Sequence, residues 1–328
     1  MVKRLRLPEY NYDFDTETGF FVRWGKTRQD DPQVSPIGPE IGDIEITTIC
    51  YSGCKHCYKS NNPNGKNMSF ETFKIILDKL PKNLTQVAFG VDSQATANPD
   101  LFKMMEYCRQ NNVVPNITVA DITEDTAEKL ASLCGAVAVS HYDTDTCKRS
   151  IQLLHEAGLK QINIHQMVSD ETLSKCYDIM NEAKNIPGLN AIVMLSLKQK
   201  GRGVGFTPLP YYLFKDMIDY AMSHKVSIGF DSCTAHKFLK YVDETGNEKL
   251  KKLSVFVEPC ESSLFSIYID VNAKAFPCSF APGTPGWETG LDMITCKAYM
   301  EDVWNNERMQ VWREGLLKNN RKCPLYNI

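Results

Sequence analysis

Residues 48–58 read Thr-Ile-Cys-Tyr-Ser-Gly-Cys-Lys-His-Cys-Tyr and place Cys50, Cys54 and Cys57 in a Cys-x3-Cys-x2-Cys pattern. This spacing predicts a tight turn that carries three thiolates on one side. Soft thiolates are the usual ligands of iron–sulfur clusters, so the loop suits three irons of a [4Fe–4S] cube. The fourth iron is then left open for a ligand that is not a side chain. The alternatives are a disulfide, chance spacing and a zinc site, although zinc usually requires paired Cys-x2-Cys knuckles.

Strand-like and helix-like segments alternate from about residue 43 to residue 231. The expected strands are 44–49, 86–91, 113–119, 136–140, 161–165, 191–197 and 226–230. One expected helix opens at Ser69, which we take as its cap, and the others lie near 99–111, 124–133, 144–157, 171–184 and 210–223. This alternation predicts an α/β fold with parallel strands joined by crossover helices. In parallel barrels chemistry gathers at the C-terminal ends of strands, which is where the cysteine loop stands.

The cysteine loop after the first strand and the six or so strand–helix units resemble the radical S-adenosylmethionine (SAM) superfamily. The resemblance implies a partial (β/α)6 barrel over residues 43–231. The residues before it, 1–42, are expected to form a hairpin extension. It implies that the open iron binds the amino and carboxylate groups of SAM. It also implies that the reduced cluster cleaves SAM and that the resulting 5′-deoxyadenosyl radical abstracts hydrogen from a substrate. A flavodoxin- or ferredoxin-type protein is the expected electron donor.

Residues near the strand ends match the SAM-binding positions of that family. Gly90 and Asp92 stand where relatives carry Gly-Gly-Glu, so Asp92 is the expected partner of the SAM ammonium group. Ser140 matches a family serine that meets the ribose or the carboxylate, and His56 stands where relatives place an aromatic residue near the adenine. The expected SAM-binding residues are His56, Tyr58, Gly90, Asp92, Ser140, Asn163, His165 and Lys198. Strand alternation sends Asn163 and His165 to one face. The alternative for these residues is ordinary packing or solvation.

The segment from Lys198 to Gly205 contains a Gly-x-Gly-x-Gly pattern. The pattern is weak evidence for phosphate binding, because it lacks both the Gly-Lys-Ser/Thr of a P-loop and the acid of a dinucleotide fold. Its position after the sixth strand puts Lys198, Lys200 and Arg202 at the expected barrel mouth. There the cations would hold the SAM carboxylate or an anionic substrate, and the alternative is a solvated loop.

The last hundred residues carry a second group of separated cysteines. Of these, Cys260 follows a Glu-Pro pair, Cys278 follows a Phe-Pro pair, and Cys323 precedes a proline. This segment resembles the SPASM or twitch domains that hold auxiliary [4Fe–4S] clusters in radical SAM enzymes. The resemblance implies such a domain over residues 232–328 with one cluster, because the dense second cysteine group of a full SPASM domain is missing. The expected ligands are Cys233, Cys260, Cys278 and Cys323, with Cys296 as the substitute. Cys108, Cys134, Cys147 and Cys176 are expected to be ordinary buried thiols.

The composition narrows the class of protein. A formal net charge of −3 over 328 residues gives no basic field that would attract nucleic acid. The longest apolar runs, such as Ala191–Leu195, are too short to span a bilayer, and the basic start is not followed by the apolar stretch of a signal peptide. Twelve cysteines without a secretion signal indicate a reducing compartment, so we expect a cytoplasmic protein.

Three functions follow from these patterns. Auxiliary clusters of the SPASM type favour a radical SAM enzyme that modifies a ribosomally made peptide or a protein. The N-terminal forty residues read as a hairpin around Thr16–Gly19 and leave no room for the winged-helix leader-binding domain of many peptide-modifying relatives. A small-molecule or nucleotide substrate is therefore the second possibility. A structural zinc protein that acts as an interaction module is the alternative of another class, and analysis for iron and sulfide against zinc distinguishes it.

Overall fold

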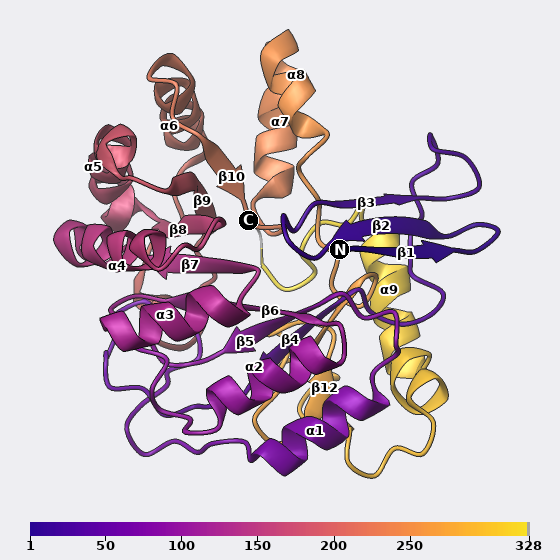
Figure 1. Cartoon of the computed structure of the whole chain (residues 1–328). Helices are drawn as coiled ribbons and strands as arrows, with labels where there is room; N and C mark the ends of the chain where they lie inside the picture. Colours follow the sequence, from indigo (N-terminus) through magenta and orange to yellow (C-terminus); the bar gives the residue numbers. More distant parts are fainter. Residues whose placement is uncertain (327–328) are drawn as a thin grey trace.

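The computed structural model describes residues 1–326, and a ten-stranded, mostly parallel sheet lies at its centre (Figure 1). The strand order is β10-β9-β8-β7-β6-β5-β4-β11-β12-β13. Strands β4 to β11 pair in parallel, and β12 and β13 are antiparallel additions at one edge. The α/β prediction with a parallel sheet is therefore confirmed. The bounds are β4 (Ile41–Glu45), β5 (Gln86–Gly90), β6 (Val114–Val119), β7 (Ala136–Ser140), β8 (Ile162–Val168), β9 (Leu189–Ser196), β10 (Ile228–Phe230), β11 (Ser266–Ile269), β12 (Lys274–Phe276) and β13 (Leu291–Asp292).

Six helices connect the parallel strands and succeed one another around the outside of the sheet in Figure 1. They are α1 (Phe70–Lys79), α2 (Leu101–Gln110), α3 (Glu124–Leu133), α4 (Thr144–Glu156), α5 (Leu173–Glu182) and α6 (Tyr211–Ser223), and the short 3-10 turns Asp170–Thr172 and Ala183–Asn185 flank α5. The predicted cap of α1 is confirmed, because the Ser69 hydroxyl accepts a hydrogen bond from the Thr72 amide at 3.2 Å. Within residues 1–326 we find no helix with the length and apolar character that a bilayer crossing requires.

The first strand of the parallel series is shorter than predicted. The sequence predicts a strand over residues 44–49, but β4 ends at Glu45, and Thr47 and Ile49 make only isolated bridges to Asn67 and Asn62. The Thr47 hydroxyl accepts a hydrogen bond from the Ile49 amide at 3.0 Å. Such local side-chain bonds compete with a strand ladder, so the chain leaves the sheet before the cysteine loop begins.

The N-terminal residues form a separate three-stranded antiparallel sheet of β1 (Val2–Arg6), β2 (Asn11–Asp15) and β3 (Phe21–Trp24). Strands β2 and β3 are the predicted hairpin, and β1 is an addition that the sequence did not reveal. The buried face of this sheet packs against the C-terminal segment through Tyr10, Tyr12 and Phe14 on one side and Leu264, Phe265 and Leu316 on the other. The two ends of the chain therefore share a second, smaller core.

The C-terminal segment adds helices and a hairpin. The helices are α7 (Ala235–Thr245), α8 (Glu248–Ser254), the π-helical turn Met300–Trp304 and α9 (Glu307–Lys318). Strands β11 and β12 form a hairpin, and its turn is held by Asp270, which accepts hydrogen bonds from the amides of Asn272 and Lys274. The sequence predicts one helix containing Trp304 and Trp312, but Asn306 caps α9 and separates the two residues. Because β11 pairs with β4, this segment extends the main sheet.

Candidate active site

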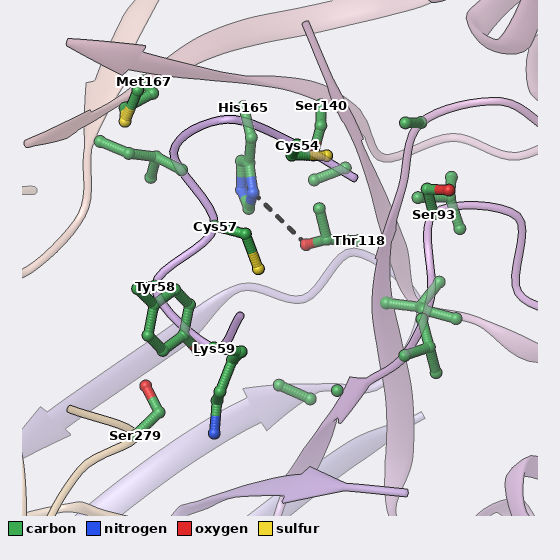
Figure 2. A pocket seen from close by; sticks show the side chains of 18 of the residues that line it. Cys54, Cys57, Tyr58, Lys59, Ser93, Thr118, Ser140, His165, Met167 and Ser279 are labelled. Atoms are coloured by element: carbon green, nitrogen blue, oxygen red, sulfur yellow. Dashed lines mark hydrogen bonds between the residues drawn. The ribbon is translucent and has the colours of Figure 1, made fainter. Parts of the chain in front are cut away.

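A cavity of about 710 Å³ lies at the C-terminal ends of the parallel strands and is lined by residues of β4 to β9 and of the loops that follow them. Pockets of about 300–1,000 Å³ are typical of small-molecule sites. The wall includes the three cysteines Cys50, Cys54 and Cys57, and Figure 2 shows Cys54, Cys57, Ser140 and His165 around the same space. All eight residues predicted to contact SAM also line it, namely His56, Tyr58, Gly90, Asp92, Ser140, Asn163, His165 and Lys198.

The cysteine loop is held by the 3-10 turn η3 (Gly201–Gly205). The Arg202 side chain donates from Nε to the Cys54 carbonyl at 2.8 Å and from Nη1 to the Asn61 carbonyl at 3.1 Å. The Arg202 amide donates to the Cys57 carbonyl at 3.0 Å. Gly201 has φ +56°, and a Cβ atom there would lie 2.4 Å from the Tyr58 carbonyl oxygen, so glycine is required for this close approach. The Gly-x-Gly-x-Gly segment therefore supports the cysteine loop.

The three cations of that segment are all bound by protein groups. Lys200 Nζ donates to the carbonyls of Phe280 and Pro282, each at 2.7 Å, so the alternative of a solvated loop does not hold for Lys200 and Arg202. Lys198 forms a buried ion pair with Asp231. Burial acts to lower the pKa of Lys198, but Asp231 and Cys233 outweigh it and raise that pKa to about 12. Lys198 is therefore a permanent cation in the cavity wall.

Strand β8 alternates as the sequence predicts. Asn163, His165 and Met167 face the cavity, whereas Ile162, Ile164 and Gln166 are fully buried on the opposite face. His165 Nδ1 lies 3.3 Å from the Thr118 hydroxyl (Figure 2). Burial lowers the pKa of His165 to about 4, so its imidazole is neutral near neutral pH. The ring is available as a hydrogen-bonding group and carries no charge.

Asp92 and Gly90 shape the loop after β5. The Asp92 side chain is buried and accepts hydrogen bonds from the amides of Thr96 at 3.1 Å and Ala97 at 3.0 Å. Its carboxylate thus stabilises its own loop, and its contact with SAM stays a prediction. A Cβ atom on Gly90 would lie 3.0 Å from Glu45 Cα, so β4 and β5 pack closely where the cavity begins. Ser140 ends β7 at the cavity wall.

Two rings of the cysteine loop pack against rings from other segments. The His56 ring lies 5.4 Å from Tyr142 and 5.8 Å from Phe206 between ring centroids, and burial, Lys175 and Arg202 lower its pKa. The Tyr58 ring lies 4.3 Å from Phe280, which comes from the C-terminal segment. Together with Tyr268 and Ser279, Phe280 brings that segment into the cavity wall. The sequence did not predict this contribution, because the three residues carry no motif.

Strand β4 contributes a pair of carboxylates that the sequence analysis missed. Asp43 and Glu45 both line the cavity, as the two-residue period of a strand requires. Lys59 Nζ lies 3.1 Å from a Glu45 carboxylate oxygen and also hydrogen-bonds the Tyr268 hydroxyl. Burial and Glu45 raise the pKa of Asp43 to about 6, against the opposing effect of Lys59. The alternation of acids in residues 43–45 was the signal that could have revealed this pair.

A second cavity of about 210 Å³ is lined by the four cysteines predicted to bind the auxiliary cluster, Cys233, Cys260, Cys278 and Cys323. Burial raises the pKa of Cys278 to about 12, so without a metal its thiol is protonated near neutral pH. Cys296, the proposed substitute, lies elsewhere, with its sulfur 3.4 Å from the Met293 carbonyl. Lys198, Tyr268 and Phe280 line both cavities, which are therefore neighbours.

All twelve cysteines, each within residues 1–326, are free thiols, and Cys108, Cys134, Cys147 and Cys176 are buried as predicted. Among the same residues no three His, Cys, Asp or Glu side chains converge on a single ion position. Thiolates that hold a cubane bind different irons, so they need not converge in this way. The donor chemistry of both cysteine groups, soft sulfur lining a cavity, fits iron–sulfur ligation.

Comparison with solved structures identifies the class of this fold. The chain is similar to Streptococcus suis SuiB bound to the precursor peptide SuiA, with a TM-score of 0.67 and 14% identity over 84% of this chain and 67% of that chain. It is also similar to SuiB bound to S-adenosylmethionine, with a TM-score of 0.56 and 15% identity over 88% of this chain and 67% of that chain. No protein-family model and no curated protein sequence matches the chain.

The chain therefore shares the fold of SuiB, a protein whose structures were solved with S-adenosylmethionine and with a precursor peptide.

Proposed function

We propose that the chain is a radical SAM enzyme with one auxiliary cluster. The observation that carries this proposal is the large cavity, whose wall combines the three cysteines of the Cys-x3-Cys-x2-Cys loop with all eight residues expected to contact SAM. In this proposal the sheet of β4 to β10 and helices α1 to α6 form a partial (β/α)6 barrel over residues 43–231. Residues 1–42 are its N-terminal extension, and residues 232–328 are a SPASM- or twitch-like domain.

Cys50, Cys54 and Cys57 would hold the SAM-binding [4Fe–4S] cluster. When bound there, the reduced cluster supplies the electron that cleaves SAM, which yields a 5′-deoxyadenosyl radical for hydrogen abstraction. The chain's own part is positioning and shielding. Arg202 fixes the loop through two of its carbonyl groups, and the neutral His165 offers a hydrogen bond without adding charge. The Tyr58 ring of the loop packs against Phe280 of the C-terminal segment, which helps to position the loop.

Cys233, Cys260, Cys278 and Cys323 would hold the auxiliary [4Fe–4S] cluster, because they line one cavity. Arg321 supports the backbone beside one ligand, since its Nε donates to the Cys260 carbonyl at 2.9 Å. Arg321 also pairs with Glu258, and Arg23 of the N-terminal sheet lies 3.2 Å from the same carboxylate. The extension would therefore help to fix the auxiliary site.

A peptide or protein is the proposed substrate class. The support is structural similarity to SuiB, which was solved with its precursor peptide. A small molecule or nucleotide is the second candidate, since the size of the cavity also suits such compounds. We also propose a flavodoxin- or ferredoxin-type electron donor and a cytoplasmic location, because two clusters and twelve free thiols need a reducing compartment.

Anaerobic SAM cleavage tests the proposed function. Reconstituted protein with SAM and a strong reductant should release 5′-deoxyadenosine without added substrate. A variant with alanine in place of Cys50, Cys54 and Cys57 should not, because the open iron requires all three local thiolates. Cleavage by the triple variant at the parent rate would show that the assignment is wrong, and zinc in place of iron and sulfide would support the structural-protein alternative.

A further inference from the structure

Three carboxylates lie where the two cavities meet: Asp43 and Asp231 line both cavities, and Glu45 lines the larger one. Two of the three have a lysine partner. Glu45 is paired with Lys59 at 3.1 Å, and Asp231 is paired with Lys198. Asp43 lines both cavities, yet its carboxylate makes no hydrogen bond or ion pair with any group in residues 1–326. The described residues therefore leave one carboxylate without a directly bonded partner, and Lys59 favours its charged form only from a distance.

The two lysines show which protein groups surround a positive charge at this place. Lys59 Nζ lies 4.0 Å from the centroid of the Tyr268 ring, and Lys198 Nζ lies 5.3 Å from that of Phe280. Each ammonium group is paired with a carboxylate, and an aromatic residue is its second neighbour: Lys198 lies near the Phe280 ring, and Lys59 is bonded to the hydroxyl of Tyr268. A carboxylate with an aromatic ring nearby favours cations over neutral groups. The carboxylate and the aromatic residue together offset the free-energy cost of removing water from the ammonium group.

Asp43 has the same surroundings but no ammonium group. It is directly opposite Tyr268 in the pairing of β4 with β11, and Tyr58 lines the same cavity. Lys59 is bonded to Glu45 and to the Tyr268 hydroxyl, and it acts on Asp43 only through its charge at longer range. Partial burial of a carboxylate without a partner costs desolvation free energy, and a cation from outside the chain would offset that free energy.

We propose that the junction of the two cavities binds a positively charged group of the substrate, an ammonium or a guanidinium, with Asp43 as its counter-ion. This inference rests on the proposed function, because it takes the larger cavity as the site where SAM and substrate meet. The junction selects lysine- or arginine-like groups, since a neutral group leaves Asp43 unpaired and an anion is repelled by it. A peptide that carries a basic side chain is the substrate form that meets this requirement.

The test compares two probes on SAM-loaded, anaerobically reconstituted protein by saturation-transfer NMR. The probes are N-acetyl-lysine methylamide and N-acetyl-norleucine methylamide, which differ by the terminal ammonium group. The parent protein should bind the lysine probe about tenfold more tightly than the norleucine probe. The Asp43→Asn variant should lose this difference while its iron content and SAM affinity stay unchanged. The matched control is Asp125→Asn on the exposed face of α3, which should keep the full preference.

Three results would overturn the inference. The first is equal or undetectable binding of both probes by the parent protein, and the second is an unchanged preference in Asp43→Asn. The third is a loss of SAM affinity in that variant, which would show that Asp43 serves the positive groups of SAM itself. Each result can occur while the parent protein still releases 5′-deoxyadenosine, so the inference and the proposed function fail separately. The parent measurement alone remains decisive if the variant does not fold.

Discussion

Replacing Asp43 by asparagine should stabilise the metal-free protein near neutral pH. The pKa of Asp43 is raised to about 6 in the folded chain, mainly by burial, against an unfolded value of about 3.9. As the pH rises between these two values, the unfolded chain releases the proton first, so the folded state loses stability. Above the folded pKa the penalty is complete. A difference of about two pKa units corresponds to about 3 kcal/mol, and partial exposure of the side chain reduces our expectation to about 1–2 kcal/mol.

Urea unfolding of thiol-reduced protein at about pH 8 and about pH 5 measures this effect. Asp43→Asn should be more stable than the parent at the higher pH, and its advantage should shrink toward the lower pH as the parent carboxylate takes up its proton. The matched control is Asp125→Asn, because Asp125 is an exposed carboxylate whose surface pair with Lys129 contributes little. A variant less stable than the parent at about pH 8, or an advantage independent of pH, would refute the argument that this carboxylate is buried without a partner.

Further changes test the two cysteine sites and the cavity wall. A variant with alanine at Cys50, Cys54 and Cys57 should retain about four irons per chain. A variant with alanine at Cys260 and Cys278 should still show the SAM cluster in its electron paramagnetic resonance spectrum. Total loss of iron from the first variant would contradict the presence of two clusters. Arg202→Gln should release iron to a chelator about tenfold faster than the parent, since it removes hydrogen bonds worth about 1.5–3 kcal/mol, and an unchanged rate would remove Arg202 as a support of the loop. The pKa of His165 is about 4 in the folded chain, below its unfolded value, so the folded parent protein loses stability as the pH falls from about 6.5 to about 4. In thermal unfolding, His165→Gln should lose less stability over that pH range. An identical loss in parent and variant would contradict a buried neutral imidazole.

Local patterns in the sequence predicted most of the parallel sheet. Strands β5 and β7 and helices α3 and α4 lie within one or two residues of their expected ranges, because each combines a clear apolar period with a polar or capping residue at its end. The cysteine spacing is also local, which is why it could suggest the fold without any knowledge of distant contacts.

Contacts between distant segments could not be predicted. Nothing in residues 266–269 indicates that they pair with β4, because an apolar β-strand pattern does not specify its neighbour. The same holds for Lys200, whose partners are two carbonyl groups of residues 280 and 282. Every residue has a backbone carbonyl, so a sequence cannot reveal which carbonyl groups accept a hydrogen bond from a lysine. The sequence therefore suggested a solvated or anion-binding lysine, whereas in the structure Lys200 is hydrogen-bonded to the C-terminal segment.

The pairing of β11 with β4 has a consequence for attempts to shorten the protein. With β11 in place, β4 has a neighbouring strand on both sides, β5 along Ile41–Glu45 and β11 along residues 41–44. A chain cut before Ser266 would leave β4, the strand that leads into the cysteine loop, as the exposed edge of a parallel sheet. Exposed apolar edges recruit strands from other molecules. Truncation before residue 266 should therefore yield an aggregating protein instead of a minimal barrel.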